Sequence, residues 1–184
     1  MRLKRLTASC AGMAIAGSGA VVATGAGEEP APAAQSLLSV LREPASEAES
    51  LPDNLASGSL SGEISSRSDA RPLGAFDGSD WYVAPGREKG YICLLQDDKA
   101  NKASGGVCTS TKSVKTGLAL SGTSPAGGES VAILAPDGYS TDGDAPKADK
   151  KARGRNAVFL TVSEPTTVKI TGTNKAPISL SLAK

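Results

Sequence analysis

From about residue 68 onward, apolar residues recur at every second position, which is the period of a half-buried β-strand. The cleanest run lies near the C-terminus, where Ile178, Leu180 and Leu182 alternate with serines. Further β-favouring runs cover 81–83, 90–95, 117–120, 130–134, 158–162 and 168–170. Turn signals rich in Pro, Gly or Asn separate them, at 85–86, 105–106, 125–128, 136–138, 164–165 and 174. The pattern predicts a mainly β fold, a small antiparallel sandwich or a partly open barrel.

The distribution of aromatic residues marks the start of this β domain. All six aromatic residues lie between Phe76 and Phe159, and residues 28–70 contain none. That earlier segment is rich in Ala, Ser, Glu, Gly and Pro, so it offers too little apolar surface to offset its own ordering entropy. It carries eight acidic and two basic residues, whereas 71–184 carries eleven acidic and fifteen basic ones. We therefore expect an acidic stalk over 28–70 and one β domain over 71–184.

Two short helical pieces are expected inside the stalk. Residues 37–41 place Leu and Val on one helical face before Pro44, and residues 46–49 fit a capping box before Pro52. Either piece is shorter than the roughly 12–15 residues that an isolated helix needs in water. Two interpretations follow. The favoured one is a stalk with transient helices, and the other is an arm that docks on the β domain.

The first 27 residues have the order of an export signal. A positive start with Arg2, Lys4 and Arg5 precedes an uncharged stretch, 6–26, which ends in the small residues of a cleavage zone. A membrane-spanning helix needs on the order of 20 apolar residues, and Gly, Ser and Thr dilute this stretch. We expect a cleaved signal peptide and a secreted protein. The alternative is a membrane-anchored protein that retains residues 6–26.

The cysteine count agrees with export. Cys10 would leave with the signal, so that Cys93 and Cys108 remain as an even pair. In an oxidising compartment we expect this pair to form a structural disulfide. The two cysteines lie on β-favouring runs that flank a polar loop, 97–104, which favours an antiparallel hairpin. The expected register sets Cys93 opposite Cys108, Leu94 opposite Val107 and Leu95 opposite Gly106.

The chain contains no histidine, which excludes Ser-His-Asp hydrolysis and nearly all zinc sites. Residues 115–117 match the Lys-Thr-Gly triplet of penicillin-recognising serine enzymes, but the partner motif Ser-x-x-Lys occurs only at 181–184. The acidic pairs Asp97–Asp98 and Asp77–Asp80 lie in turn-like stretches, where Asp bonds local backbone. We therefore predict no catalytic residue and no cofactor.

A basic run lies close to a cluster of acidic residues. It comprises Lys147, Lys150, Lys151, Arg153 and Arg155 in an expected loop at 144–155. No aromatic residues are interleaved with it, so the run does not indicate nucleic-acid binding. A solvated loop is the favoured interpretation. The alternative is contact with an anionic cell-wall polymer or an envelope protein.

Two further groups are weak candidates for binding. Trp81 and Tyr82 are adjacent, so on a strand they face opposite sides, and one ring is expected in the core and the other on the surface. A surface ring would be free to stack on sugar or peptide. The acidic cluster is a weak Ca²⁺ candidate without EF-hand spacing, and a solvated loop is favoured over a metal site. Its members are Asp137, Asp142, Asp144 and Asp149.

The chain contains seven short motifs in a fixed order, at 40–44, 51–52, 81–86, 92–94, 106–108, 135–138 and 155–159. Their order resembles a group of uncharacterised exported proteins of high-GC Gram-positive bacteria, over most of the chain that follows the signal. The resemblance implies export and the disulfide, and no reaction. We therefore expect an exported non-catalytic binding or structural domain at or outside the cell envelope. The alternatives are a small His-independent hydrolase of envelope material and a membrane-anchored extracytoplasmic sensor domain.

Overall fold

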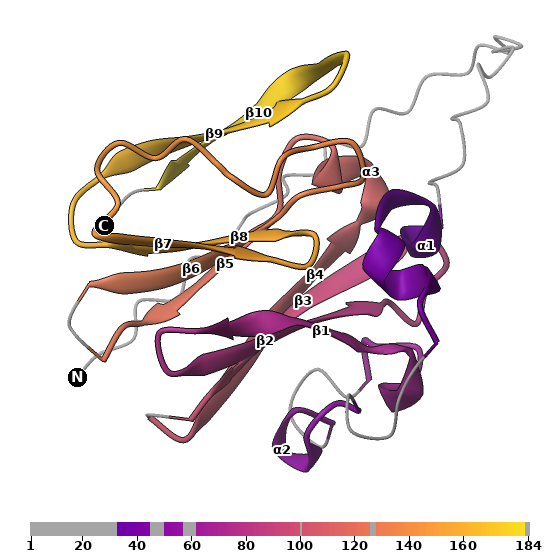
Figure 1. The fold of residues 1–184 in the computed structure, drawn as a ribbon. Coiled ribbons are helices and arrows are strands. Elements are labelled where there is room, and N and C mark those ends of the chain that lie inside the picture. The colour runs from indigo at the N-terminus through magenta and orange to yellow at the C-terminus, as the bar shows by residue number, and fades with distance from the viewer. Residues whose placement is uncertain (1–32, 45–49, 57–61, 100, 126–127, 183–184) are drawn as a thin grey trace, which may run out of the picture.

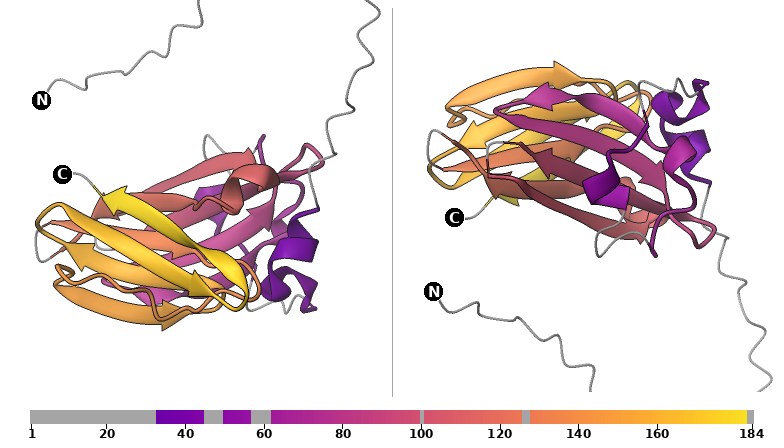
Figure 2. Two further views of the ribbon diagram at one scale, coloured as in Figure 1. Left: turned by 90° about the horizontal axis from the view of Figure 1, so that it is seen from above. Right: turned by 90° about the horizontal axis from the view of Figure 1, so that it is seen from below.

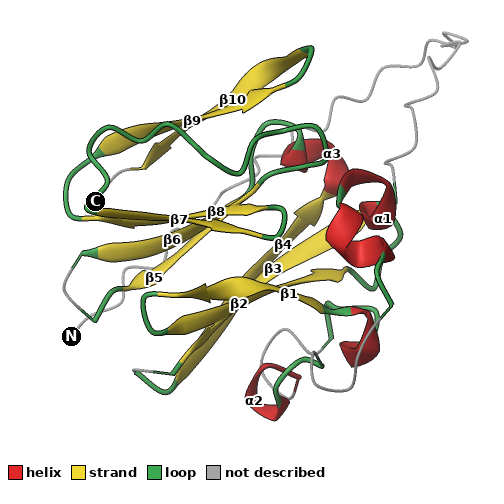
Figure 3. Ribbon diagram, in the orientation of Figure 1, coloured by secondary structure: helices red, strands yellow, loops and turns green. Residues whose placement is uncertain are grey.

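Three antiparallel sheets are stacked as layers in the computed structural model (Figure 1). The structure describes residues 33–44, 50–56, 62–99, 101–125 and 128–182. Short helices lie at one end of the stack and beneath the first sheet (Figure 3). The mainly β prediction is confirmed, and the described residues form stacked sheets with no closed barrel. The predicted signal at 1–27, the start of the predicted stalk and its capping box at 46–49 lie outside the described residues.

The first sheet is a meander with the strand order β1-β2-β3-β4. Its strands are β1 (Arg71–Phe76), β2 (Ser79–Pro85), β3 (Tyr91–Asp98) and β4 (Ala103–Ser110). Asp77 and Gly78 form the β1–β2 turn with φ of 50° and 82°, the left-handed pair that an Asp-Gly hairpin turn requires. The register in β1 shifts between Pro72 and Gly74.

The second sheet has the order β5-β6-β8-β7 and lies between the other two layers. Its strands are β5 (Ala119–Thr123), β6 (Glu129–Leu134), β7 (Lys150–Gly154) and β8 (Ala157–Val162). The third layer is the C-terminal hairpin, formed by β9 (Thr166–Gly172) and β10 (Lys175–Leu182). All six residues of β8 are buried, because both faces of its sheet are covered.

Each interface between layers contains its own apolar cluster. Trp81 and Val83 of the first sheet pack with Leu134 and Phe159 of the second. On the other face of the second sheet, Leu160 packs with residues of the C-terminal hairpin. Figure 2 shows this hairpin over the second sheet in one view, and the first sheet from below in the other. Covered faces on both sides explain how a chain with few aromatic residues buries enough apolar surface.

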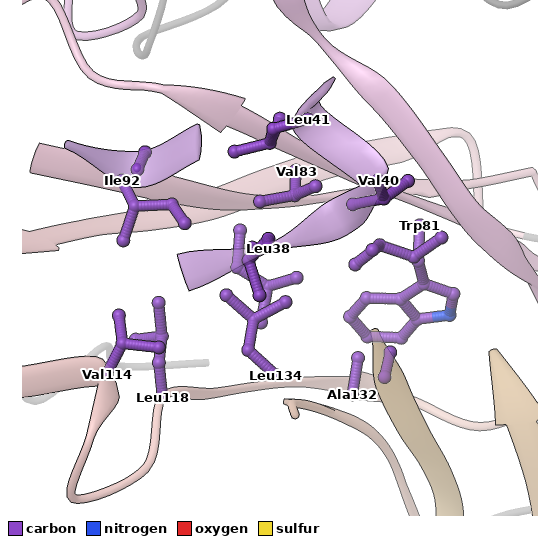
Figure 4. Close-up of a cluster of buried hydrophobic side chains, with 14 of the residues drawn as sticks. Leu38, Val40, Leu41, Trp81, Val83, Ile92, Val114, Leu118, Ala132 and Leu134 are labelled. Carbon is purple, nitrogen blue, oxygen red and sulfur yellow. The ribbon is translucent and has the colours of Figure 1, made fainter. Parts of the chain in front are cut away.

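The N-terminal segment 33–44, called the arm below, packs into the first of these clusters. It contains α1 (Ala34–Leu37) and the 3-10 helix η1 (Ser39–Arg42). Leu38 and Val40 are almost fully buried, and Figure 4 shows them among Trp81, Val83 and Leu134. The docking interpretation of this segment therefore fits the described residues, and the transient-helix interpretation does not.

Residues 50–56 and 62–70 cover the outer face of the first sheet. They include α2 (Asp53–Ala56) and the 3-10 helix η3 (Arg67–Asp69). Leu51, Leu55 and Ile64 pack there against Tyr82 and Leu95. This cover corrects the expectation that either Trp81 or Tyr82 lies on the surface: Trp81 is 0% exposed and Tyr82 8%.

The predicted cysteine register is confirmed in full. Cys93 and Cys108 are directly opposed and disulfide-bonded, with their Cα atoms 4.0 Å apart. Leu94 lies opposite Val107 and Leu95 opposite Gly106. The predicted polar loop was too long, because the strands continue to Asp98 and resume at Ala103. The turn expected at 105–106 is therefore wrong, since both glycines belong to β4.

The expected basic loop at 144–155 is also corrected. Lys150, Lys151 and Arg153 lie on β7, which is an edge strand paired only with β8 among the described residues. Lysines on an edge strand discourage pairing with another chain. The structure contains one further short helix, α3 (Thr111–Val114), after β4. Among the described residues, no helix is long and apolar enough to cross a membrane.

Candidate functional site

A cleft of about 510 Å³ lies where the arm meets the C-terminal hairpin. Four separate parts of the chain contribute to it: the arm, the residue that follows α3, the loop after β6 and the start of β10. We call it the arm cleft, and its lining residues are Ser36, Leu37, Lys115, Pro136, Asp137, Tyr139, Lys175 and Ala176. The site therefore exists only when the arm is docked.

Asp137 joins the loop after β6 to the arm. Its Oδ1 accepts the backbone N–H of Ser39 at 2.8 Å, and its Oδ2 accepts the Arg42 guanidinium at 2.8 Å. The backbone N–H of Asp137 in turn donates to the carbonyl of Leu37 at 2.8 Å. Burial raises the pKa of Asp137, but hydrogen bonds from Ser39, Asn156 and Arg42 outweigh it and hold the pKa below its ordinary value.

Asn156, in the turn between β7 and β8, completes this anchor. Its backbone is left-handed, with φ of 53°, a conformation that Asn tolerates better than most residues. Its Oδ1 accepts both the Ser39 hydroxyl and the Val40 N–H at 3.0 Å. Its Nδ2 donates to the Asp137 carboxylate at 3.0 Å. One side chain thus fixes the arm and the loop after β6 together.

The opposite wall of the cleft is an aromatic ring held beneath a lysine. The Lys175 Nζ lies 5.2 Å from the centre of the Tyr139 ring and donates to the Asp137 carbonyl at 2.6 Å. The Tyr139 hydroxyl donates to the Ala176 carbonyl at 3.1 Å. An ammonium group has three donors, so Lys175 retains protons for a ligand. The ring and the cation are both oriented before any ligand arrives.

The charge of the arm cleft is positive. Arg42 offsets the Asp137 carboxylate, while Lys115 and Lys175 add two cations at the lining. Lys115 is exposed, and no ion pair joins it to another described residue. The arrangement is able to bind an anionic group between the lysines, with an apolar part of the ligand against Leu37 and Tyr139. Of the sequence candidates, Lys115 of the Lys-Thr-Gly triplet and Asp137 of the acidic cluster lie in this cleft.

The basic run lies elsewhere and is largely paired within the chain. Lys150 contacts Asp77 at 3.2 Å, and both Lys151 and Arg153 contact Asp142, at 3.9 Å and 2.7 Å. Arg155 pairs with Glu43 of the arm. Lys147 lines a separate open groove beside Pro165 and Leu182. These pairs give the run a structural role, and its contact with a wall polymer or envelope protein stays a prediction.

The acidic candidates are not brought together. Asp137 is engaged by the arm, Asp142 by the basic run, and Asp144 exchanges backbone hydrogen bonds with Lys169 at 2.8 Å. Within the described ranges, no group of three His, Cys, Asp or Glu side chains is placed to hold a metal ion. The weak Ca²⁺ candidate therefore gains no support from the geometry.

The first sheet separates one expected acidic pair and creates another. Asp77 bonds to Lys150 and to the Thr161 hydroxyl of the second sheet. Asp80 instead lies directly opposite Asp97 across β2 and β3. Lys99 contacts Asp80 at 2.5 Å, and the Asn54 amide donates to Asp97 at 2.6 Å. Both carboxylates are thus held by fixed partners.

The sequence analysis missed Tyr139 and Lys175 as site residues. The signals that were present are the turns at 136–138 and at 174, which place these two residues beside each other in space. A comparison of the chain with known protein families, with curated proteins and with solved structures finds no match.

Proposed function

We propose that the chain is an exported, non-catalytic binding domain of the cell envelope, and that the arm cleft takes an anionic ligand. The observation that carries this proposal is the pair Lys115 and Lys175 at the lining of a cleft with an oriented aromatic wall. The disulfide supports export, because such bonds persist mainly in oxidising compartments. The ligand class is a carboxylate or phosphate group carried by a partly apolar molecule or a polymer.

A binding role suits the cleft better than hydrolysis. Its one carboxylate, Asp137, accepts hydrogen bonds from three groups of the fold, and its one serine, Ser36, donates to the Ala33 carbonyl at 2.7 Å. A carboxylate that acts as general acid or base must instead reach the substrate. The hydrolase and the anchored sensor remain alternative hypotheses that no specific contact of the cleft favours.

The test uses the exported protein purified after expression of the whole chain. Binding to polyphosphate and to polyglutamate is measured by titration calorimetry at low and at high salt. We expect binding to one of these polymers, weakened by salt and lowered about tenfold or more in the Lys115→Gln/Lys175→Gln double variant.

The matched control is the Lys150→Gln/Lys151→Gln double variant, which removes the same charge from the basic run. It should bind like the unmodified protein. The proposal fails if neither polymer binds, or if the cleft variant binds normally. It also fails if the control variant alone loses binding, since the basic run would then be the site.

A further inference from the structure

Tyr91 is the one large hydrophobic side chain that lies exposed among the described residues, with 41% of its surface accessible. It begins β3, at the opposite end of the β2–β3 turn from Pro85. Other aromatic side chains on this sheet, such as Trp81 and Tyr82, are buried. An exposed ring of this kind is available to stack on a ligand, and the turn and the hollows around it bear on whether it does so.

The ring is mounted on a rigid turn. The Gly86 N–H donates to the Tyr91 carbonyl at 2.9 Å, and the Tyr91 N–H donates to the Glu88 carbonyl at 3.1 Å. A Cβ at Gly86 would lie 2.5 Å from the Cβ of Tyr91, so only glycine permits this approach. The Cys93–Cys108 bridge lies two residues further along β3. The backbone and Cβ that carry the ring are therefore fixed before binding, which lowers the entropic cost of recognition.

Two hollows adjoin the ring, of about 230 Å³ and about 250 Å³. Tyr91 and Glu88 line both of them, so the two hollows meet at these residues. Asp69 and Lys89 line the first hollow, and Glu63 and Arg87 the second. Both hollows are smaller than the ~300–1,000 Å³ of sites that hold drug-sized ligands. Each therefore suits one small ring or side group.

We propose that Tyr91 is the stacking platform of a second binding site, which takes an uncharged oligosaccharide with one sugar unit in each hollow. The apolar face of a sugar ring packs on an aromatic ring, and sugar hydroxyls donate to carboxylates and accept from cations. Glu63, Asp69 and Glu88 supply the acceptors, and Arg87 and Lys89 the donors. The charges of these three acidic and two basic side chains nearly cancel. The surface around Tyr91 therefore does not favour a polyanion of the kind expected at the arm cleft.

A sugar fits this surface better than a protein partner does. Protein hot spots place their aromatic anchors within a dry apolar surround. Here small and polar residues flank Tyr91 together with five charged ones, and the other large hydrophobic side chains of the described residues are covered. The inference is independent of the proposed function, because the two sites share no lining residue.

The experiment titrates the whole exported protein, labelled with ¹⁵N, with cellohexaose and with chitohexaose. We expect one of them to shift the amide signals of Gly62, Arg87 and Tyr91 and to leave those of Tyr139 and Lys175 unchanged. Tyr91→Ala should lower the affinity about tenfold or more, whereas Tyr91→Phe, which keeps the ring, should stay within about threefold. Unchanged far-ultraviolet circular dichroism of Tyr91→Ala shows that its fold is intact.

One double variant separates this proposal from the preceding one. Lys115→Gln/Lys175→Gln should bind the oligosaccharide normally, even if it no longer binds a polyanion. The proposal is overturned if neither sugar binds at millimolar concentration, if Tyr91→Ala binds as well as the unmodified protein, or if the shifts fall on the arm cleft. The proposal is also overturned, in favour of a protein-docking surface, if neither sugar binds and the unmodified protein captures a protein from envelope extract that Tyr91→Ala does not capture.

Discussion

The side chain of Asn156 accepts a hydrogen bond from the backbone N–H of Val40, a residue 116 positions earlier in the chain. This bond, together with the hydrogen bonds of Asp137, fixes the arm, which is short and contains no aromatic residues. The arm in return supplies Leu38 and Val40 to the cluster between the first two sheets. The polar anchor sets the position of the arm, and apolar burial supplies most of its free energy of docking.

Leu38→Ala tests this apolar contribution. The Leu38 side chain is fully buried, so its truncation should lower the free energy of unfolding by about 2–5 kcal/mol. The matched control is Leu37→Ala, because Leu37 lies one position earlier and is only partly buried. This variant should lower the free energy of unfolding clearly less. Urea denaturation followed by circular dichroism measures both. Equal losses in the two variants would show that the arm does not dock as described.

Acid should weaken the polar anchor. The pKa of Asp137 is held below its ordinary 3.8, so its contribution to stability is complete above that value and is lost as pH falls through the folded-state pKa. The free energy of unfolding, measured by urea denaturation, should therefore fall between pH 5 and pH 2.5. It should fall less in Asp137→Asn, whose free energy of unfolding is already lower at pH 5. The same fall in both proteins would contradict this role.

The acid loss should not vanish in that variant, because Asp77 contributes in the same direction. A hydrogen bond from Ser124 lowers the pKa of Asp77, burial raises it, and bonds from Lys150 and Thr161 lower it further. Asp77→Asn should accordingly remove a separate part of the acid dependence. The two effects should add, since one carboxylate fixes the arm and the other fixes the β1–β2 turn to the second sheet.

Local patterns in the sequence predicted the strands well and the site poorly. Runs of β-favouring residues identified seven strands, and the cysteine pair on either side of a local connection predicted the register of β3 with β4. Strand β1 was missed because Pro72 and the shift at Gly74 interrupt its alternation. Strand β7 was missed because an edge strand with Lys150, Lys151 and Arg153 has the composition of a loop.

The arm cleft was missed for a different reason. Lys115, Asp137 and Lys175 come from three turns that are far apart in the chain, and only the stacking of layers brings them together. Likewise, the expectation that either Trp81 or Tyr82 lies on the surface assumed that one face of the first sheet meets water. The cover supplied by Leu51 and Leu55 is a tertiary contact of a segment with weak patterning of its own.

The Cys93–Cys108 bridge should be a major source of stability. It closes a loop of 15 residues, for which the chain-entropy relation gives about 3 kcal/mol. Cys93→Ala/Cys108→Ala should lower the free energy of unfolding by about 2–5 kcal/mol. Reductant should lower the stability of the unmodified protein and leave the variant unchanged. Labelling of both cysteines in the folded, unreduced protein would contradict the bridge.

The opposed carboxylates of Asp80 and Asp97 should be visible in the titration of Tyr82. Burial raises the pKa of Tyr82 above its ordinary 10.0, and the negative charges of Asp80 and Asp97 raise it further. Asp80→Asn removes one of these charges and keeps the nearby Lys99 cation, so the pKa of Tyr82 should fall toward its ordinary value. Absorbance at 295 nm against pH follows the phenolate, and Tyr82→Phe identifies its signal.

The same shift has a consequence for stability in alkali. Because the folded-state pKa of Tyr82 is raised, its contribution is complete below pH 10 and is lost as pH rises through the folded-state pKa. Urea denaturation between pH 9 and pH 11.5 should show a smaller loss for Tyr82→Phe than for the unmodified protein, with Asp80→Asn between the two. A phenolate signal that does not move in Asp80→Asn would show that the Asp80 carboxylate does not act on Tyr82, and that burial beneath residues 50–56 and 62–70 dominates the pKa of Tyr82.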